Sequence, residues 1–549
     1  MGSYAATPFV YTPPPELKGA GRRRAVVIVG AGPVGLCCAI DLALHGVPTV
    51  LLDDGDVVSH GSRAICWAKR TLEIFDRLGV GRRMVDKGVT WNRGRVFHRD
   101  RELFRFDLLP ESGHRRPAFI NLQQYYVEEY LVDRARDFPD LIDLRWKNKV
   151  AGVSPRPDGV TLDVETPDGS YTLDADWLIA ADGARSPVRA MMGLSLEGTS
   201  FEERFLIADV RMEADFPTER LFWFEPTFHA GQSALMHRQP DNVFRLDFQL
   251  GPDADPELER RPDRVMPRIR AVVGDDTPVE LEWCSVYSFR CARLPRFVHG
   301  RVVFAGDSAH VVSPFGARGG NGGVQDADNL CWKLARVLKG QSPASLIDTY
   351  DEERGRGADE NILNSSRTTD FMSPRTPTAR TFRDAVLALA AERPFARALL
   401  NAGRLSKPCR LEDLTPQTPD AIEGGLPAGA PCPDAPVVGP DGQAGWLLDH
   451  LGGVFTLLIF AEGAPPVPAD PGLRVVLVSP RPWAAPGAAV LLDPEGVARR
   501  RYTGGRDMAL LIRPDAHVAA RFPEASAPTI ADALARATGH APSPKRNAA

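Results

Sequence analysis

Gly30-Ala31-Gly32-Pro33-Val34-Gly35 follows directly after the apolar run from Ala25 to Val29. Glycines between a strand and a helix allow a tight turn and let the backbone approach a pyrophosphate at the helix N-terminus. A helical pattern from Leu36 to His45 and a second apolar run from Pro48 to Leu52 continue the unit. The stretch therefore predicts the first strand-helix-strand unit of a dinucleotide-binding fold.

Three acidic residues extend this prediction. Asp53 and Asp54 end the second strand, where a carboxylate is expected to accept the hydroxyls of an adenosine ribose. Much later the chain reads Phe304-Ala305-Gly306-Asp307-Ser308-Ala309-His310, and Asp307 would present its carboxylate to the hydroxyl chain of the same ligand. The alternatives are a solvated turn residue for Asp53 and a helix N-cap for Asp307.

Length and composition restrict the class of protein. The chain has 549 residues, enough for three or four domain-sized units, and its net charge of −5 arises from interspersed acids and bases. This favours neither nucleic acid nor an anionic membrane as a partner. No apolar run is long enough for a membrane span, and the eight cysteines form no CxxC or metal-ligand spacing. We expect a cytoplasmic protein without a metal site.

The pattern along the chain predicts several further elements. Residues 1–24 are rich in proline and glycine and predict an N-terminal arm. Helices are expected at 69–78, 123–138 and 324–338, with more helix through 345–403, and alternating strands at 143–179 and 201–289. A linker rich in proline and glycine begins near 415. Beyond it we expect strands at 455–460, 473–478, 488–492 and 508–512 and a helix at 530–538.

A third turn lies between the two glycine motifs, and it reads Asp182-Gly183-Ala184-Arg185-Ser186-Pro187-Val188-Arg189. With these three motifs in this order, residues 25–400 resemble the single-component (class A) flavin-dependent aromatic hydroxylases, such as para-hydroxybenzoate hydroxylase and phenol hydroxylase. The stretch from Leu511 to Ala519 resembles the thioredoxin-like last domain of longer members, although it lacks the redox CxxC.

The resemblance implies an α/β fold in three parts. A Rossmann-like FAD-binding domain with a helical extension would comprise residues 25–190 and 290–405. A mostly β substrate domain would be interposed at 191–289, and a thioredoxin-like α/β domain would follow at 415–545.

The same resemblance assigns the cofactor site. Asp182 and Arg189 match a motif associated with flavin and nicotinamide binding, and the alternative is a mutual ion pair that holds the turn. Arg63 and Gln124 match positions that contact the phosphate and ribityl portions of the flavin. The expected FAD contacts are Gly30, Gly32, Pro33, Gly35, Asp53, Asp54, Arg63, Gln124, Asp182, Gly183, Arg189, Gly306, Asp307, Gly319, Gly320 and Asn321.

The glycine-rich segment from Pro314 to Gly323 comes just before the predicted helix at 324–338. Its exposed backbone N–H groups and the helix dipole would stabilise a reduced, anionic flavin, with a flexible surface loop as the alternative. Relatives often carry bulkier residues at Gly320 and Gly322, so we expect a more mobile loop or a roomier pocket here. Pro314, Gly320 and Asn321 are the expected catalytic positions, with Pro314 near the flavin edge.

The resemblance also implies the reaction. NADH or NADPH would reduce the flavin, O₂ would add to give a C4a-hydroperoxide, and one oxygen atom would be transferred to a phenolic or related aromatic ring. No separate nicotinamide fold is visible in the sequence, so the donor would bind transiently. Either NADH or NADPH fits the sequence as the electron donor. The assembly considered for the protein is a homodimer.

Residues that contact the aromatic substrate are sought on the interposed sheet, because alternate strand positions face one side. A histidine or tyrosine there is a candidate to take a phenolic proton, and an arginine to pair with a carboxylate. The candidates are Arg204, Trp223, Phe224, His237, Arg245, Phe248 and Tyr287, together with Pro314. Two other functions stay open: an epoxidase or Baeyer–Villiger oxygenase acting on a polycyclic compound, and a flavin-binding sensor without oxygenase activity.

Overall fold

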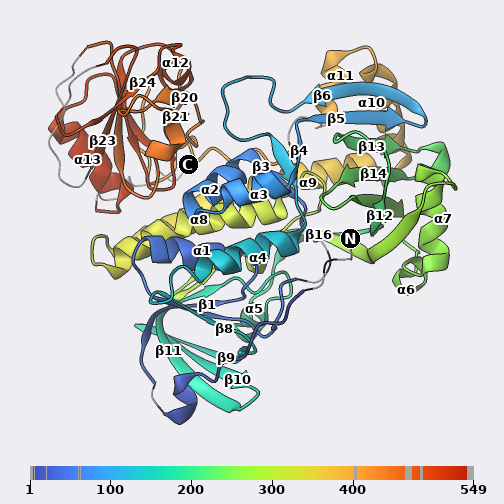
Figure 1. Cartoon of the computed structure of the whole chain (residues 1–549), viewed down its shortest axis with the longest axis horizontal. Helices are drawn as coiled ribbons and strands as arrows, with labels where there is room; N and C mark the ends of the chain where they lie inside the picture. Colours follow the sequence, from blue (N-terminus) through green and yellow to red (C-terminus); the bar gives the residue numbers. More distant parts are fainter. Residues whose placement is uncertain are drawn as a thin grey trace.

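The computed structural model describes residues 4, 6–19, 21–59, 61, 63–400, 405–463, 473–482 and 486–540. Parts of the expected arm (1–3, 5 and 20), of the helical extension (401–404) and of the last domain (464–472, 483–485 and 541–545) lie outside these residues. Figure 1 shows the first domain below, with the second large sheet and the C-terminal domain as separate lobes above it.

The first sheet has parallel strands at its centre, in the order β18-β11-β1-β2-β8. Its inner strands are apolar and buried on both faces, as parallel strands between layers require. Three helices, α1, α4 and α8, lie along one face (Figure 1). The bounds are β1 Arg24–Val29, β2 Thr49–Leu52, β8 Ile142–Arg145, β11 Gly169–Ala180, β18 Val302–Phe304, α1 Pro33–Leu44, α4 Gln124–Ala135 and α8 Gly319–Leu338.

Short antiparallel elements complete the first domain. Strands β9 and β10 extend the sheet beside β11, β17 pairs with β18, and β3, β7 and β4 form a small separate sheet. The helix expected at 69–78 is α2 with the same bounds. The bounds are β3 Cys66–Ala68, α2 Lys69–Leu78, α3 Gly81–Lys87, β4 Val89–Trp91, β7 Phe119–Asn121, β9 Lys149–Arg156, β10 Gly159–Thr166, α5 Pro187–Met191 and β17 Val298–His299.

The second large sheet is the interposed β region, in the order β19-β16-β12-β15-β14-β13-β5-β6. Strands β5 and β6 come from residues 93–107, inside the range expected for the first domain, because β5 pairs in parallel with β13. Helix α7 covers one face, and α9, α10 and α11 pack on the other. The bounds are β5 Arg93–His98, β6 Arg101–Asp107, β12 Glu197–Met212, β13 Arg220–Phe224, β14 Ser233–Arg238, β15 Val243–Leu250, α6 Pro256–Glu259, α7 Pro262–Val273, β16 Val279–Arg293, β19 His310–Val311, α9 Asp348–Met372, α10 Pro377–Ala390 and α11 Pro394–Leu399.

The C-terminal domain contains a seven-stranded sheet in the order β21-β20-β24-β23-β22-β25-β26. Strands β24, β23 and β22 are parallel, whereas β25 and β26 form an antiparallel hairpin beside β22. Its one cysteine, Cys432, is buried and unpaired. The bounds are β20 Pro436–Val438, β21 Ala444–Trp446, β22 Thr456–Phe460, β23 Arg474–Ser479, β24 Ala489–Leu492, α12 Val497–Thr503, β25 Met508–Ile512, β26 Val518–Phe522 and α13 Ala527–Ala537.

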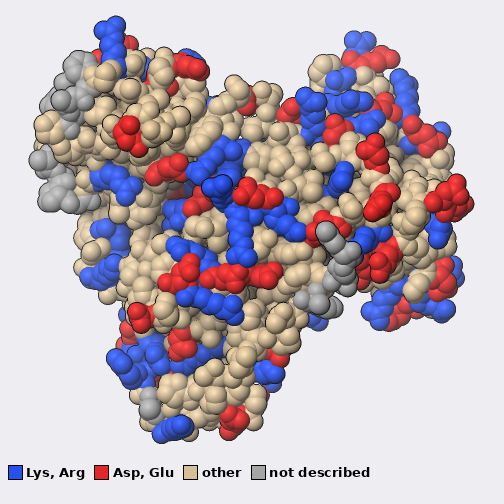
Figure 2. Space-filling model, in the orientation of Figure 1, with Lys and Arg blue, Asp and Glu red and all other residues tan. Residues whose placement is uncertain are grey.

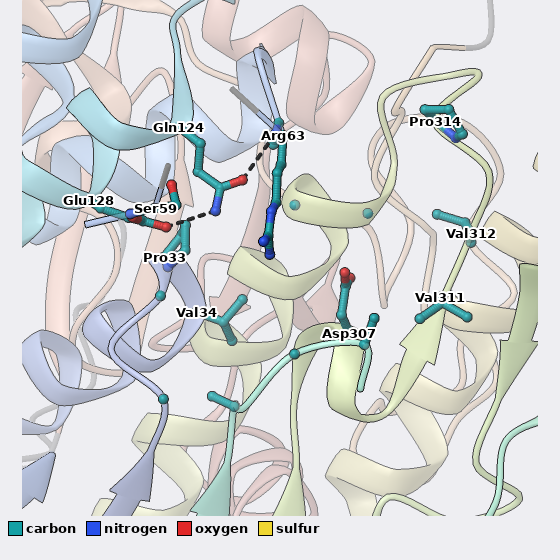
Figure 3. Close-up of a pocket in the computed structure, with 18 of the residues that line it drawn as sticks. Pro33, Val34, Ser59, Arg63, Gln124, Glu128, Asp307, Val311, Val312 and Pro314 are labelled. Atoms are coloured by element: carbon teal, nitrogen blue, oxygen red, sulfur yellow. Dashed lines mark hydrogen bonds between the residues drawn. The ribbon is translucent and has the colours of Figure 1, made fainter. Parts of the chain in front are cut away.

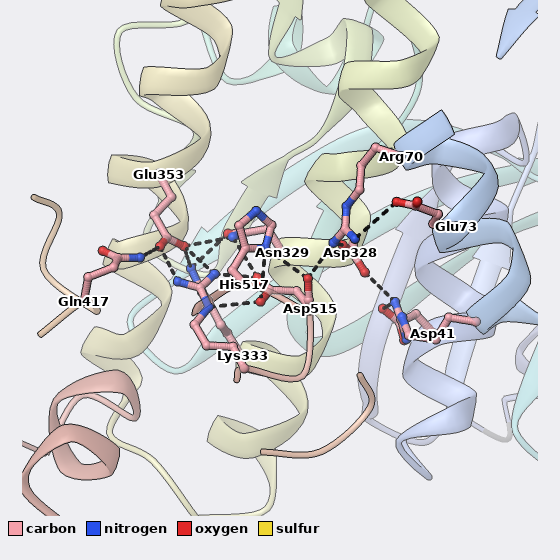
Figure 4. A network of polar contacts seen from close by, with 12 residues as sticks. Asp41, Arg70, Glu73, Asp328, Asn329, Lys333, Glu353, Gln417, Asp515 and His517 are labelled. Carbon is pink, nitrogen blue, oxygen red and sulfur yellow. Dashed lines mark hydrogen bonds and ion pairs between the residues drawn. The ribbon is translucent and has the colours of Figure 1, made fainter. Parts of the chain in front are cut away.

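A buried polar network attaches this domain to the first one (Figure 4). Arg513 donates to Asp515 at 3.0 Å and to Glu353 of α9, and Lys333 of α8 donates to Glu353 at 2.6 Å. Burial alone would raise the pKa of Glu353, but the charges of Arg513 and Lys333 lower it. Apolar residues surround the network, with Trp332 of α8 packed on Phe455. The last domain is therefore joined to α8 and α9 through a desolvated interface.

The outer surface carries mixed charge. Basic and acidic side chains are interspersed over the face shown in Figure 2. Within the described ranges, no helix combines the length and the apolar character that a membrane crossing requires.

Candidate active site

A cavity of about 1140 Å³ lies between the carboxyl ends of the parallel strands and one face of the second sheet. Ligands bind at this edge of open α/β sheets. The cavity is lined by thirteen of the sixteen predicted cofactor contacts: Gly30, Gly32, Pro33, Asp53, Asp54, Arg63, Gln124, Asp182, Gly183, Asp307, Gly319, Gly320 and Asn321. The two glycine motifs thus share one crevice, although they lie far apart in the sequence.

The first glycine turn is closed by backbone contacts that exclude side chains. A Cβ on Gly30, whose φ is +103°, would lie 2.5 Å from the carbonyl oxygen of Ala181, and one on Gly35 would lie 1.9 Å from that of Gly30. Gly32 instead faces open space at the N-terminus of α1. Gly35 therefore shapes the turn without lining the cavity, and Gly32 leaves room where a phosphate meets the helix N-terminus.

Asp53 holds the turn from the end of β2. Its Oδ2 accepts a hydrogen bond from the Ala31 N–H at 2.6 Å, and its Oδ1 accepts from the Gly55 N–H at 2.8 Å. Burial raises the pKa of this carboxyl. Each carboxylate oxygen has a second lone pair, so Asp53 can also accept ribose hydroxyls.

Arg63 and Asp307 lie on opposite sides of the cavity, and both side chains project into it (Figure 3). Asp307 lines this space, and desolvation by the surrounding protein raises the pKa of its carboxyl. Beside Arg63, Gln124 accepts from the Ala64 N–H at 3.0 Å and donates to Glu128 at 2.7 Å. The amide of Gln124 thus positions the loop that carries Arg63.

The Asp182 turn does not form the ion pair considered above. Asp182 accepts from the Val188 N–H at 3.0 Å, and its Oδ1 is buried with no hydrogen-bond partner among the described residues. Arg189 does not line the cavity, because its guanidinium donates to the carbonyl oxygens of Ser308 at 2.9 Å and Ala184 at 2.6 Å. Arg189 therefore ties the Asp182 turn to the Asp307 motif.

Gly306 does not line the cavity but forms a hydrogen bond within the protein. Its N–H donates to Asp326 of α8 at 2.9 Å, and Asp326 is paired with His310 at 2.7 Å and with Arg354 at 2.6 Å. Burial alone would raise the pKa of Asp326, but His310 and Arg354 lower it. This buried carboxylate fixes the turn that presents Asp307.

Helix α8 begins at Gly319, five residues before the predicted start, so its glycines lie in the first helical turns. They are needed for packing: a Cβ on Gly323 would lie 2.6 Å from Val34, and one on Gly320 would lie 3.3 Å from the ring of Trp67. Trp67 therefore occupies the space that was expected to make the pocket roomier at Gly320. The free N–H groups of the first turn still point to the cavity end of the helix.

The side chain of Asn321 joins α8 to β3 and to the segment before α8 through hydrogen bonds. Its Oδ1 accepts from the Ala68 N–H at 2.8 Å, and its Nδ2 donates to the carbonyl oxygens of Cys66 at 2.8 Å and Ala317 at 2.7 Å. All three contacts are with backbone. The side chain therefore positions β3 against the segment that follows Pro314, and because Asn321 also lines the cavity its catalytic role stays a prediction.

The second sheet supplies the other end of the cavity. His237 of β14, Arg245 of β15 and Tyr287 of β16 line it as predicted, and so does Pro314. Arg204 and Phe224 do not line it. Arg245 is paired with Asp209 at 2.9 Å.

Two further predicted substrate contacts, Trp223 and Phe248, do not line the cavity either. Trp223 and Phe248 point to the opposite face of the sheet, where Trp223 stacks on Phe97 and Phe248 packs against His229. Side chains alternate along a strand, so Phe248 lies one position away from Asp247, which does line the cavity. The sequence showed the strands, but which face is inward depends on the helices that cover the other side.

Arg220 of β13 and Asp247 of β15 were not predicted, and both line the cavity. Asp247 is 7% exposed and has no ion pair or hydrogen bond with any described residue. Burial raises its pKa to about 7, although Arg245 and Arg220 oppose the shift. The Nε of Arg220 is likewise buried without a partner in the described chain. Asp247 lies two positions after Arg245 on β15, so strand alternation places both side chains on one face. This spacing was the signal in the sequence that could have identified Asp247.

Comparison with known proteins agrees with this geometry. The family described as "FAD binding domain" matches residues 23–365. The chain belongs to this family. It is 31% identical over 531 residues to the 6-methylpretetramide 4-monooxygenase of Streptomyces rimosus, covering 92% of each chain. It is 32% identical over 378 residues to the 3-(3-hydroxy-phenyl)propionate/3-hydroxycinnamic acid hydroxylase of Burkholderia cenocepacia (strain HI2424), covering 68% of each.

Among solved structures, the flavin-dependent monooxygenase PieE, in complex with FAD and substrate, has the same fold. The TM-score is 0.79 at 24% identity, with 95% of this chain and all of the other covered. The protein is accordingly a flavin-dependent monooxygenase, and FAD is its cofactor.

The residues of this monooxygenase fit FAD. The glycine cradle at Gly30 and Gly32 is open toward the cavity, and the orphaned Oδ1 of Asp182 and the cavity-facing carboxylate of Asp307 can accept hydrogen bonds there. When bound, FAD supplies the electron transfer and the activation of oxygen, while the protein orients the reactants and excludes water.

Proposed function

We propose that this flavin-dependent monooxygenase hydroxylates the ring of a phenolic or related aromatic substrate, with NADH or NADPH and O₂ as cosubstrates. One observation carries the proposal: a single cavity extends from the cofactor motifs at Gly30 and Asp307 to the polar pair Arg220 and Asp247. An aromatic ring in this cavity would lie between Trp91, Leu235 and Phe289, with its hydroxyl near the polar pair.

Asp247 is the proposed acceptor of the phenolic proton. A proton acceptor works best when its pKa is close to the working pH, and the pKa of Asp247 is about 7. Burial lowers the pKa of His237 far below its usual value, which makes this imidazole a poor acceptor. The cation of Arg220 would stabilise the phenolate, which is the more electron-rich form of the ring.

All eight cysteines are unpaired, as is usual in a reducing cytoplasm. We propose a cytoplasmic enzyme in which the nicotinamide binds transiently, and a homodimer that light scattering would detect. A thioredoxin-like C-terminal domain without a redox role is supported by its parallel strands, its antiparallel hairpin and its single cysteine.

The test uses purified holoenzyme and a panel of phenols. We expect NAD(P)H oxidation that is stimulated by the substrate, and a product that has gained one oxygen atom on the ring. An epoxide product would favour the epoxidase, and a ring-expanded ester would favour the Baeyer–Villiger oxygenase. Absence of turnover in protein that contains flavin would favour the sensor.

Asp247→Asn tests the proton acceptor. At pH 7 we expect kcat/KM to fall by about 100-fold with normal flavin content, and the decline of activity below pH 7 to disappear. Asp253→Asn, at an exposed position, is the matched control. Full activity in Asp247→Asn would remove Asp247 from the proposed mechanism.

A further inference from the structure

Asn121, the last residue of β7, does not line the main cavity, but its side chain contacts a residue that does. Its Oδ1 accepts from the indole N–H of Trp91 at 2.8 Å, and its Nδ2 donates to the carbonyl oxygen of Arg238 at 2.8 Å. An indole N–H can only donate, and a carbonyl oxygen can only accept. Both partners therefore fix the same orientation of the amide, which leaves the second N–H of Nδ2 for another acceptor.

This second N–H faces His237 of β14. The Nδ2 of Asn121 lies 3.5 Å from the Nδ1 of His237, and both side chains are buried. The imidazole is neutral, because burial and the cations of Arg220 and Arg245 hold its pKa far below the usual value. A neutral imidazole carries one proton, and a proton on Nδ1 would point one donor at another. The proton therefore belongs on Nε2.

The Nε2 edge of His237 lies at the wall of the main cavity. Its described partner is the Sγ of Cys66 at 3.9 Å, and both residues line the cavity. A thiol sulfur is a weak acceptor, and the thiol itself donates to the Oδ1 of Asn121 at 3.2 Å. This N–H of His237 can therefore donate to a stronger acceptor that enters the cavity.

The order of the strands places this donor between the two members of the proposed polar pair. Strand β14 lies between β13, which carries Arg220, and β15, which carries Asp247. Leu235 of β14 pairs with Asp247, and His237 follows two positions later on the same face of the sheet. A phenolic oxygen held between Arg220 and Asp247 would thus lie over β14, beside the imidazole.

We propose that Asn121 is a positioning residue that holds His237 as the tautomer with its proton on Nε2, and that this N–H donates to the phenolic oxygen of the substrate. The inference rests on the proposed function and adds a hydrogen-bond donor to it. The phenolic proton would pass to the carboxylate of Asp247, and the phenolate oxygen would then accept from His237. Hydrogen bonds to ionised groups are stronger than those between neutral groups, so this donor favours the ionised ring.

The tautomer can be measured in the oxidised holoenzyme without substrate. In protein labelled with nitrogen-15 histidine, the NMR chemical shifts of the two ring nitrogens show which of them is protonated. His237→Gln identifies the signals of His237 among those of the eleven histidines. We expect a protonated Nε2 and an unprotonated Nδ1. A proton on Nδ1, or on both nitrogens, would overturn the proposal, whether or not variants at Asn121 fold.

Asn121→Asp replaces the donor that faces Nδ1 by an acceptor of nearly the same shape. An ionised carboxylate only accepts, so we expect the proton of His237 to move to Nδ1. Asn242→Asp adds the same charge in an exposed turn and should leave the signals of His237 unchanged. Unchanged signals in Asn121→Asp would contradict the role assigned to Asn121.

Phenol binding to the oxidised holoenzyme tests the donor itself. Calorimetry compares the effect of Asn121→Asp in two backgrounds, wild type and His237→Leu, because any direct effect of the new charge is common to both. We expect the loss of phenol affinity to be about tenfold larger when His237 is present. Equal losses in the two backgrounds would show that Asn121 does not act through His237.

The outcomes also separate this proposal from the proposed function. A protonated Nε2 and a coupled loss of phenol binding, without hydroxylation of any phenol, would retain the donor and reject the hydroxylase. Hydroxylation of phenol by an enzyme whose His237 carries its proton on Nδ1 would do the reverse.

Discussion

The carbonyl oxygen of Gly30 fills the space that a side chain on Gly35 would need, 1.9 Å from its Cβ position. Gly32 lies between them in the sequence, and a Cβ placed on it would meet no atom within 4 Å. The three glycines of the turn therefore have different duties, and substitutions can separate them.

We expect Gly35→Ala to disrupt the turn itself and to destabilise the protein by about 3 kcal/mol or more, because backbone must move. Gly32→Ala should leave the stability of the flavin-free protein within about 0.5 kcal/mol but lower its FAD affinity. Urea unfolding of the apoprotein and FAD titration measure the two effects. Equal behaviour of the two variants would contradict this division of roles.

Asp307→Ala should yield protein that is largely free of flavin, because the substitution removes the carboxylate that faces the cavity opposite Arg63. The ratio of absorbance near ~450 nm to that of the protein reports occupancy. Asp168→Ala, in an exposed turn, should retain the wild-type ratio. Full occupancy in Asp307→Ala would contradict the assigned contact.

The stability of the protein should depend on Asp247 in a defined pH range. Its folded-state pKa is raised from 3.8 to about 7, so the stabilisation from protonation is complete below pH 4 and is lost as the pH rises through 7. The carboxyl faces Arg220 and Arg245, with Asp209, His237 and Cys66 nearby, and none of these relieves its burial fully. Asp247→Asn removes the buried charge.

We therefore expect Asp247→Asn to be more stable than wild type at pH 8, by about 1–2 kcal/mol, with a smaller gain at pH 5. Urea unfolding at the two pH values measures the difference. A gain that stays constant between pH 5 and pH 8 would show that the carboxyl does not titrate in this range.

Glu353→Gln tests the attachment of the C-terminal domain. Without this carboxylate, the cations of Arg513 and Lys333 remain buried without their shared negative partner. We expect the free energy of unfolding to fall by about 3–5 kcal/mol. Thermal unfolding should show the loss, and limited proteolysis should release the last domain. Glu392→Gln, at an exposed position, should change neither measurement.

The core of the first domain was predictable because its signals are local. Apolar runs such as Ala25 to Val29 and the stop at Gly79 identify a strand and the end of α2 without knowledge of the fold. The start of α8 was not, because glycines have low helix propensity. Their packing against Val34 and Trp67 overrides that propensity, and these partners lie more than 250 residues away.

The site divides in the same way. The three turn motifs identified the cavity, since each motif follows its own strand, and the ends of these strands, β1, β11 and β18, meet at one edge of the sheet. The substrate end depended on the orientation of single residues: Phe248 was chosen where its neighbour Asp247 faces the cavity. Pairing of β5 with β13 was equally hidden, because strand partners are set by the assembled sheet.

Arg220 lines the main cavity and also a neighbouring cavity of about 360 Å³, which is lined by Val96 as well. A shorter side chain at Arg220 would merge the two spaces, and a larger one at Val96 would close the second, without altering any group at the cofactor end. The length of the molecule that the enzyme accepts can therefore change in single steps, during evolution or by design, while its redox machinery is inherited intact.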